Sequence, residues 1–498
     1  MNLRRLILLC AVTAPVLAGL LRAAGESPRR PNILYILADD MGWTAPSCFG
    51  NKDVATPNLD RLAAQGMKFT QAYAETQCSP TRAAFLSGQF GARTGVFRVT
   101  HEVQAPYTYL QEPKANTALQ PEVATLAQTL RAAGYATGLS GKWHITPDYD
   151  AAPLRERDGG KYFDRYGFDY CGAADQNEPA GDKAVVAITD EIIGFIERNQ
   201  ARPWFAYVAH FSPHTRLLAP KALIENHAAR GYKRTTAPNG RFLERPSAEY
   251  LAMLEHLDNN IGRLLARLDD LGLANDTLVV FTSDNGGLQV VTSNAPLRAG
   301  KGSPYEGGLR VPMMVRWPGK IAAGTVCTVP IHAIDYYPTF AELAGARVDP
   351  AHHLDGTSLL ALWRGQVRTL SRDTLAWHMP SYTVGYGRAP CSVIRRGEWK
   401  LVHYFGDYID VSVSNPGDRP PGKLVLGVRT ELYNLRDDLG EQNDLAAKLP
   451  GKTAELKLAL EAWWRSTGAT FPTRNPAYDA VGWSTMPRPA AVEKKAND

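Results

Sequence analysis

The segment CSPTR at residues 78–82 combines a thiol, a helix-starting proline and a cation within little more than one helical turn. Pro80 pre-sets the first turn, and the free backbone N–H groups of that turn point toward residue 78, where they favour an oxyanion. Arg82, one turn on, can aim a fixed positive charge at the same point. We therefore expect Ser79 to be the N-cap of a short helix, with Cys78 just ahead of it. A helix start that contains Cys and Arg by chance is the alternative that these residues alone leave open.

Two pairs of oxygen-bearing side chains, Asp39-Asp40 and Asp284-Asn285, each follow a short apolar run. In open α/β sheets, ligands collect at the carboxyl ends of the strands, so two such pairs can converge on one ion. Three carboxylates and one amide oxygen suit Ca²⁺ better than Zn²⁺, which would ask for His or Cys. Together they predict a calcium site, although either pair by itself is more often a turn.

Separate loops carry a further set of titratable side chains: Lys142, His144, His214 and Lys301. The first three follow predicted strands, and Lys301 lies in the loop 294–302. A lone His or Lys in a loop is usually just solvated. Their shared placement favours function, because transfer of an anionic group needs fixed cations, an acid for the leaving oxygen and a base for a later step.

Apolar runs that alternate with helical patterns must position these groups. Residues 32–38 form a nearly continuous apolar run, which is typical of a strand buried on both faces. Thr56-Pro57 then opens a helix as N-cap and first residue. Further helix-to-strand units follow at 125–133 to 135–139, 185–199 to 204–209, and 250–271 to 277–282. This alternation predicts an α/β fold with a large, mostly parallel sheet sandwiched by helices.

The pattern changes after about residue 370. Short strand-like pieces at 392–396, 399–404 and 430–433 are followed by a helix near 454–465, which predicts a small antiparallel sheet with a covering helix. A chain of 498 residues also exceeds what one core usually organises. We expect a signal peptide at 1–25, a catalytic domain at 26–372 and a small C-terminal α+β subdomain with a tail at 373–498.

The composition is that of an ordinary globular protein, with a formal charge of +5 and 21% charged residues. No run of Lys and Arg with interleaved aromatics is present, so we expect no nucleic-acid partner. Arg4 and Arg5, the apolar stretch 6–21 and small residues at 23–25 predict a signal peptide and export to the periplasm or the medium. A membrane anchor is the alternative, but the stretch is shorter than the roughly 20 apolar residues that a spanning helix needs, and Pro15 interrupts it.

Removal of the signal peptide would take Cys10 with it and leave an odd number of cysteines, so one of them should have a separate role. Cys48, Cys171, Cys327 and Cys391 show no metal-like spacing. Buried thiols and up to two disulfide bridges both remain open for them.

The motifs taken together resemble the sulfatase family, Cys-type and formylglycine-dependent, within the alkaline-phosphatase-like superfamily. They appear in family order as DDMGW at 39–43, TPNLDRL at 56–62, CSPTR at 78–82, GKWH at 141–144, TSDNG at 282–286 and the Lys301 loop. The resemblance covers most of the chain. It departs from the family pattern at residues 145–146 and 215–216, which puts the local loop shapes in doubt.

The resemblance implies a role for each candidate residue. One Ca²⁺ would be bound by Asp39, Asp40, Asp284 and Asn285 together with Cys78, after its oxidation to formylglycine by a maturation enzyme of the formylglycine-generating or radical type. Arg82 and Lys142 would hold the formylglycine and the sulfate. His144, His214 and Lys301 would handle proton transfer and sulfate binding.

The implied reaction is hydrolysis of the sulfate ester of a carbohydrate or an aryl alcohol to the alcohol and inorganic sulfate. A hydroxyl of the hydrated aldehyde would attack sulfur, His214 or Lys301 would protonate the leaving alcohol, and His144 would take the proton of the second hydroxyl. The alternatives are a phosphodiesterase or phosphonate monoester hydrolase of the same superfamily, and a non-catalytic relative that binds sulfated glycans. Trp377-His378, Tyr404 and the insert 146–172 could line the outer cleft or could equally be packing.

Overall fold

The structure is a computed structural model that describes residues 30–99, 108–146, 155, 161–177, 180–234, 245–410 and 423–479. The expected signal peptide at 1–25 lies outside this part of the chain. Within the described ranges, no helix combines the length and the apolar character that crossing a membrane requires. The five cysteines of the described part, Cys48, Cys78, Cys171, Cys327 and Cys391, are all free thiols. The possibility of disulfide bridges among them is therefore wrong for this structure.

A nine-stranded mixed sheet forms the centre of the molecule, with the strand order β10-β2-β8-β7-β1-β6-β4-β5 and β9 beside β2. Strands β7, β1, β6 and β4 run parallel, while β8 runs antiparallel between β7 and β2. The bounds are β1 (Asn32–Ala38), β2 (Met67–Tyr73), β4 (Ala136–Gly141), β5 (Tyr170–Cys171), β6 (Trp204–Ala209), β7 (Thr277–Ser283), β8 (Arg310–Arg316), β9 (Thr325–Cys327) and β10 (Ile331–His332). The predicted mostly parallel sheet is confirmed.

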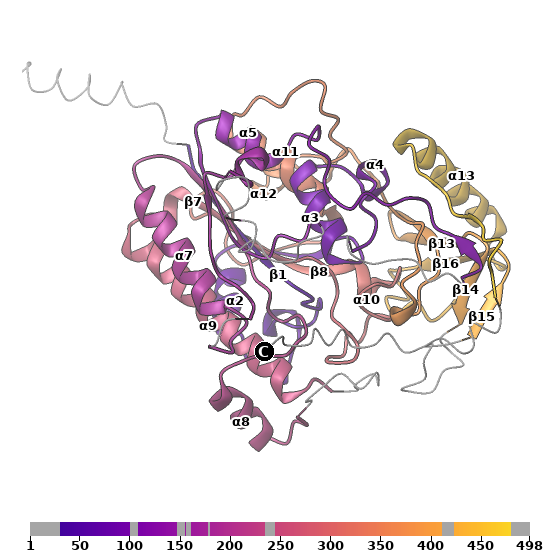
Figure 1. Ribbon diagram of the computed structural model, residues 1–498, viewed down its shortest axis with the longest axis horizontal. Coiled ribbons are helices and arrows are strands. Elements are labelled where there is room, and N and C mark those ends of the chain that lie inside the picture. Colours follow the sequence, from indigo (N-terminus) through magenta and orange to yellow (C-terminus); the bar gives the residue numbers. More distant parts are fainter. Residues whose placement is uncertain are drawn as a thin grey trace, which may run out of the picture.

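Helices cover both faces of this sheet (Figure 1). Ile33, Tyr35 and Leu37 of β1 pack into a core with α3, α5, α11 and α12, whereas Leu34 and Ile36 pack on the other face with α2, α7 and α9. This division explains the continuous apolar run of β1, because alternate side chains enter two different cores. The bounds are α2 (Pro57–Ala64), α3 (Cys78–Ser87), α5 (Leu126–Ala132), α7 (Val185–Arg198), α9 (Ala248–Asp270), α11 (Tyr336–Ala344) and α12 (Leu360–Trp363).

Several short elements connect the strands and helices or flank them. They are α4 (Gly91–Thr94), α8 (Lys221–Ala229), α10 (Glu306–Leu309), β3 (Leu110–Gln111) and β17 (Thr473–Arg474), with single 3₁₀ turns η1 (Ser47–Phe49), η3 (Asp164–Tyr166), η4 (Ala274–Asp276), η5 (Ala333–Asp335) and η6 (Val384–Tyr386).

Helix α3 begins earlier than the sequence suggested. Cys78 is its first residue and Gln77 is the N-cap, because the backbone N–H of Thr81 already donates to the carbonyl oxygen of Gln77 at 3.2 Å. The expectation that Ser79 caps the helix is therefore wrong. Pro80 is tolerated as the third helical residue because the first turn of a helix has no intrahelical acceptors for its N–H groups.

A second, antiparallel sheet with the order β11-β12-β13-β16 lies beside the large sheet, on the right in Figure 1. Its strands are β11 (Thr374–Met379), β12 (Cys391–Arg396), β13 (Trp399–Tyr404) and β16 (Arg429–Asn434), with a nearby hairpin of β14 (Asp407–Asp410) and β15 (Lys423–Leu426). Helix α13 (Pro450–Thr467) covers one face through Leu456 and Leu460. The predicted antiparallel sheet with a helix is confirmed, and the domain division after residue 372 stays a prediction.

Buried charges join the two sheets. Lys400 of β13 is 1% exposed, and its Nζ contacts Glu306 of α10 at 2.9 Å and Glu441 at 2.8 Å. Glu441 also accepts the backbone N–H of Glu306 at 2.7 Å. Burial lowers the pKa of Lys400, but the two carboxylates outweigh that effect and raise it. This network holds α10, which follows the Lys301 loop, against the second sheet.

Trp377, His378 and Tyr404 are packing residues rather than residues that line an outer cleft. All three are at least 96% buried, and the Trp377 indole donates to the carbonyl oxygen of Ala74 at 2.9 Å. His378 lies 2.7 Å from the Ser392 hydroxyl and 2.7 Å from the carbonyl oxygen of Thr470. Burial lowers the pKa of His378 to about 4, so its ring is neutral in the folded protein.

We expect His378 to contribute to acid lability. In the unfolded chain this ring takes up a proton below about pH 6.5, whereas in the folded chain it does so only near pH 4. The free energy of unfolding therefore decreases as the pH falls from about 6.5 to about 4. Between pH 7.5 and pH 5, the free energy of unfolding should decrease by about 2 kcal/mol less in His378→Gln than in the natural protein. Urea unfolding at both pH values measures this, and an identical pH dependence in both proteins would contradict it.

Candidate active site

The candidate residues of the sequence converge at the carboxyl ends of the parallel strands. The hydrogen bonds between neighbouring strands continue as far as these residues. The N–H of Asp284 donates to the carbonyl oxygen of Ala38 at 3.1 Å, and the N–H of Lys142 donates to the carbonyl oxygen of Ala209 at 2.7 Å. Asp39-Asp40 thus follow β1, Asp284-Asn285 follow β7, and Lys142 follows β4. Cys78 and Arg82 approach the same edge from α3, and each of these side chains is at least 99% buried.

Cys78 lies between anionic and cationic partners. Its Sγ is 3.2 Å from Asp39 Oδ1, 3.9 Å from Asp40 Oδ1 and 3.5 Å from Lys301 Nζ. Burial raises the pKa of the thiol well above its usual value, and the charges of Asp284 and Asp39 raise it further. These effects favour the protonated thiol, which is a poorer nucleophile than the thiolate.

The carboxylates and Asn285 form a compact group of oxygen atoms. Asp40 is held in a left-handed backbone conformation, with φ of 63°, and its Oδ1 accepts from Asn285 Nδ2 at 2.8 Å. The other amide atom, Asn285 Oδ1, is buried and has no hydrogen-bond partner. Ligand atoms of Asp39, Asp40, Cys78 and His214 lie within 4.8 Å of one another. An unpaired buried oxygen beside several carboxylates fits a hard cation such as Ca²⁺.

Asp284 has a different environment from the other two carboxylates. Its Oδ2 accepts from Arg82 Nη2 at 2.8 Å and Nε at 3.2 Å, and its Oδ1 accepts the backbone N–H of Asp40 at 3.1 Å. Burial and the charge of Asp39 raise the Asp284 pKa to about 6. Burial by itself would raise the Asp39 pKa, but the positive charges around it together outweigh burial and hold that pKa well below its usual range. The largest of these charges is the Lys142 ammonium, 2.5 Å away.

The cations have distinct positions. Arg82 Nη1 donates to the carbonyl oxygen of Lys142 at 3.0 Å and to Tyr207 at 3.3 Å, so α3 is fastened to β4 and β6. Lys301 Nζ lies 2.7 Å from Asp40, whose charge raises the Lys301 pKa well above normal despite burial. Lys301 is therefore firmly protonated.

His214 differs from these cations because its ring is neutral. Burial and the charge of Lys301 lower the His214 pKa to about 3. Its Nδ1 contacts the carbonyl oxygen of Thr215, which can only accept, so Nδ1 carries the proton. Nε2 then lies 3.7 Å from Asp40 Oδ2. His214 can accept a proton or bind a cation in this state.

His144 stands at the same end of β4 as Lys142. It is 2% exposed and adopts a left-handed backbone conformation, with φ of 57°. The preceding Trp143 packs edge-on against Phe163 and Tyr166, with ring centroids 5.0 and 4.8 Å away. This aromatic anchor supports the unfavourable backbone of the next residue, which is a common feature of functional loops.

Two glycine-rich loops position Lys301 by direct backbone packing. A Cβ at Gly286 would lie 1.7 Å from the carbonyl oxygen of Gly307, so no side chain fits there. The Gly286 N–H donates to Gly308 at 3.0 Å, and the Lys301 N–H donates to Gly287 at 3.1 Å. Glycine in both loops thus brings Lys301 to the site.

Sequence reasoning missed two supporting residues. The Thr81 hydroxyl donates to the carbonyl oxygen of Asp284 at 2.5 Å and joins α3 to the end of β7. Its place inside the 78–82 segment could have drawn attention to it. Tyr207 supports Arg82 but lies within the apolar run of β6, where no sequence signal distinguishes it from a core residue.

Comparison with known proteins gives consistent matches. The family model Sulfatase matches residues 31–346, and the model described as N-sulphoglucosamine sulphohydrolase, C-terminal, matches 300–414. A protein named Sulfatase from Formosa agariphila is 32% identical over 92% of this chain and 93% of its own length. Arylsulfatase A of Homo sapiens is 31% identical over 88% of each chain.

Solved structures agree with these matches. The structure described as Ps i-CgsB in complex with k-i-k-neocarrahexaose is 25% identical, with a TM-score of 0.69, over 92% of this chain and 98% of that chain. The expected alkaline-phosphatase-like fold is therefore confirmed.

Arg82→Lys should destabilise the protein by about 3 kcal/mol, because a single ammonium cannot contact Asp284, Tyr207 and the Lys142 carbonyl together and leaves buried carboxylates less compensated. Urea unfolding measures the change. The matched control is Arg263→Lys, whose partner Asp190 is on the surface and whose effect should stay within about 1 kcal/mol. Equal effects of the two replacements would refute the assigned role of Arg82.

Proposed function

The chain belongs to the sulfatase family of sulfuric ester hydrolases, and we propose that it releases sulfate from a carbohydrate or aryl sulfate ester at residue 78. The observation that carries the proposal is the position of Cys78 Sγ, 3.2 Å from Asp39 and 3.5 Å from Lys301. A sulfate ester placed there would meet fixed cations in a buried site, where electrostatic stabilisation is strongest. A carbohydrate is the favoured substrate because the relative with the bound oligosaccharide matches nearly the whole chain.

Formylglycine would replace the inert thiol at position 78. Its hydrated aldehyde supplies one hydroxyl that attacks sulfur and a second whose deprotonation expels sulfate. Lys142 contacts Asp39 and Arg82 contacts Asp284, so these two cations fix the carboxylates beside residue 78. Because Cys78 is 1% exposed, a formylglycine-generating or radical maturation enzyme must reach it before the chain has folded.

The protonation states divide the proton-transfer roles. Lys301 carries a proton that Asp40 stabilises, so it is the group that can donate to the leaving alcohol. This favours Lys301 over His214 as the acid. His144 is the candidate base for the second hydroxyl, because it follows β4 at the same strand end as Lys142.

One Ca²⁺ per chain would be held by Asp39, Asp40, Asp284 and Asn285 together with residue 78. The carboxylates and the unpartnered Asn285 Oδ1 fit that ion. A bound divalent cation supplies positive charge beside residue 78 and lowers the pKa of a hydroxyl there. His214 lies close enough to the same group to be a further ligand.

Export is part of the same proposal and rests on the signal-like residues 1–25. A phosphodiesterase or phosphonate monoester hydrolase is the nearest alternative activity, since tetrahedral oxyanions of similar size can share one site. Comparison of rates on matched aryl sulfate, phosphodiester and phosphonate esters separates these activities. A non-catalytic glycan-binding relative is disfavoured because the sequence contains every side chain that the proposed reaction uses.

Cys78→Ala should lower turnover of an aryl sulfate by at least roughly 10⁴-fold in protein from a host that matures sulfatases, because no aldehyde can form. The matched control is Cys48→Ala, whose thiol lies in η1 and whose loss should leave activity intact. Peptide mass analysis across residue 78 of the natural sequence should show the aldehyde. An unmodified thiol in protein that is fully active would overturn the proposal.

Asn285→Ala should lower calcium affinity by about 10- to 100-fold, because it removes the buried amide oxygen that has no other partner. Titration calorimetry on protein stripped with a chelator measures the affinity. The control Asn199→Ala removes a partly buried hydrogen bond of a side-chain amide at the end of α7, and it should leave calcium affinity unchanged. Unaltered calcium binding in Asn285→Ala would exclude this residue as a ligand.

A further inference from the structure

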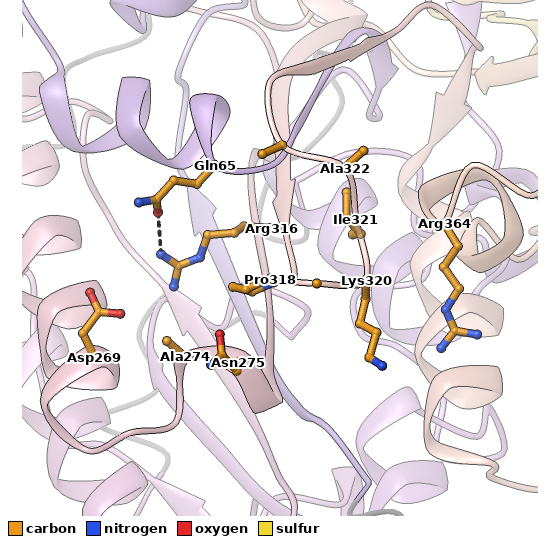
Figure 2. Close-up of a pocket in the computed structure, with 12 residues that line it drawn as sticks. Gln65, Asp269, Ala274, Asn275, Arg316, Pro318, Lys320, Ile321, Ala322 and Arg364 are labelled. Atoms are coloured by element: carbon orange, nitrogen blue, oxygen red, sulfur yellow. Dashed lines mark hydrogen bonds between the residues drawn. The ribbon is translucent and has the colours of Figure 1, made fainter.

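A cavity of about 750 Å³ lies at the end of the large sheet opposite to Cys78 (Figure 2). Arg316, the last residue of β8, pairs with Val279 near the start of β7, whereas Asp284 follows the other end of β7. The cavity is therefore separated from the active site by the length of the strands. Its volume falls in the range of roughly 300–1,000 Å³ that is typical of ligand sites.

Arg316 reaches this cavity with an incompletely satisfied guanidinium. The residue is 3% exposed, and its Nη1 donates to Gln65 Oε1 at 2.9 Å. Its Nε and Nη2 atoms are buried and have no hydrogen-bond partner. A buried charged group without partners costs several kcal/mol, so such a group calls for a ligand or an ordered solvent molecule.

The two unsatisfied atoms share one edge of the guanidinium plane. Nε–H and an N–H of Nη2 point the same way and form the fork that binds two oxygens of a carboxylate, sulfate or phosphate in parallel. Burial lowers the pKa of Arg316, opposed by the nearby charge of Asp269, yet arginine keeps its proton under all ordinary conditions. The fork is thus a charged donor pair that no side chain or backbone group of the described chain contacts.

Other charged residues line the same cavity away from Arg316. Lys320 and Arg364 lie together on the opposite side in Figure 2, and both are exposed. Asp269 is the one carboxylate among the lining residues. The side chain of Arg364 lies over the ring of Trp317, 5.4 Å from its centroid, which holds it near the rim. Cations therefore outnumber carboxylates, and they stand at both ends of the cavity.

We propose that this cavity is a second anion-binding site, in which the Nε and Nη2 edge of Arg316 takes a tetrahedral oxyanion such as sulfate. The oxyanion is either the free ion or a sulfate group on a larger molecule. In the second case, Lys320 and Arg364 contact further anionic groups of the same molecule. The site does not depend on the activity proposed for Cys78, because none of its residues reaches that side of the sheet.

Replacement Arg316→Met tests the site, since methionine fills similar space without charge or donors. Thermal unfolding is compared in sodium chloride and in sodium sulfate at matched ionic strength. We expect the variant to be at least as stable as the natural protein in chloride, because an unpaired buried charge is removed. Sulfate should stabilise the natural protein more than the variant, while sulfate bound at the active site contributes equally to both.

Calorimetric titration with inorganic sulfate should show one fewer bound ion in Arg316→Met, and any residual affinity there should be at least roughly tenfold weaker. Crystals soaked in selenate should show an anomalous peak beside Arg316. Turnover of an aryl sulfate should be unchanged. Equal sulfate stabilisation of both proteins, or water alone beside Arg316 in selenate, would overturn the site.

A double variant, Lys320→Gln with Arg364→Gln, identifies the source of the oxyanion and remains informative if Arg316→Met fails to fold. Both positions are exposed, so the fold should tolerate the changes. If the ligand is a multiply sulfated molecule, sucrose octasulfate should bind this variant several-fold more weakly, while inorganic sulfate binds as before. If the free ion is the ligand, sucrose octasulfate should bind the natural protein and the double variant equally. Inorganic sulfate should then be the ligand that occupies the site beside Arg316.

Discussion

Compensation of buried charge around residue 78 is the constraint on which the arrangement of the site depends. The carboxylates that follow β1 and β7 are buried, and burial of an unpaired charge carries a large free-energy cost. They are tolerated because Arg82, Lys142 and Lys301 each contact at least one of them at 2.8 Å or less. Opposing charges thus fix the oxygen atoms before any substrate arrives. Such preorganisation is what stabilisation of a transferring sulfate requires.

Compensation of buried charge also links the second sheet to the active site. Lys301 comes from a loop held by backbone packing between Gly286 and Gly307, and the next element, α10, begins with Glu306. Glu306 is fixed by Lys400 of the second sheet. Loss of that buried contact would leave Arg310 as the cation that pairs with Glu306 and would remove the ammonium that Glu441 contacts. The antiparallel sheet therefore supports the geometry of the active site from behind, without supplying a side chain to the reacting group.

Two arginines are buried to a similar degree but differ in how many of their nitrogen atoms have hydrogen-bond partners. Arg82 makes hydrogen bonds through all three of its nitrogens, with acceptors from three strands or their ends, and its charge is matched by Asp284. Arg316, at the other end of the sheet, has Gln65 as its acceptor and an unsatisfied edge. The first is explained within the chain. The second is explained most simply by an external oxyanion, so the sheet carries anion-recognising groups at both of its ends.

The sequence by itself determined the elements and the residue types of the site, because both are written in local patterns. The apolar run 32–38, the pair Asp284-Asn285 and the segment 78–82 predicted a parallel sheet, an oxygen-rich edge and a helix terminus there, and the structure contains all three. Only the tertiary structure decided which groups are satisfied. The unpaired Oδ1 of Asn285 and the unpaired edge of Arg316 depend on contacts between segments far apart in the chain, which no local pattern encodes.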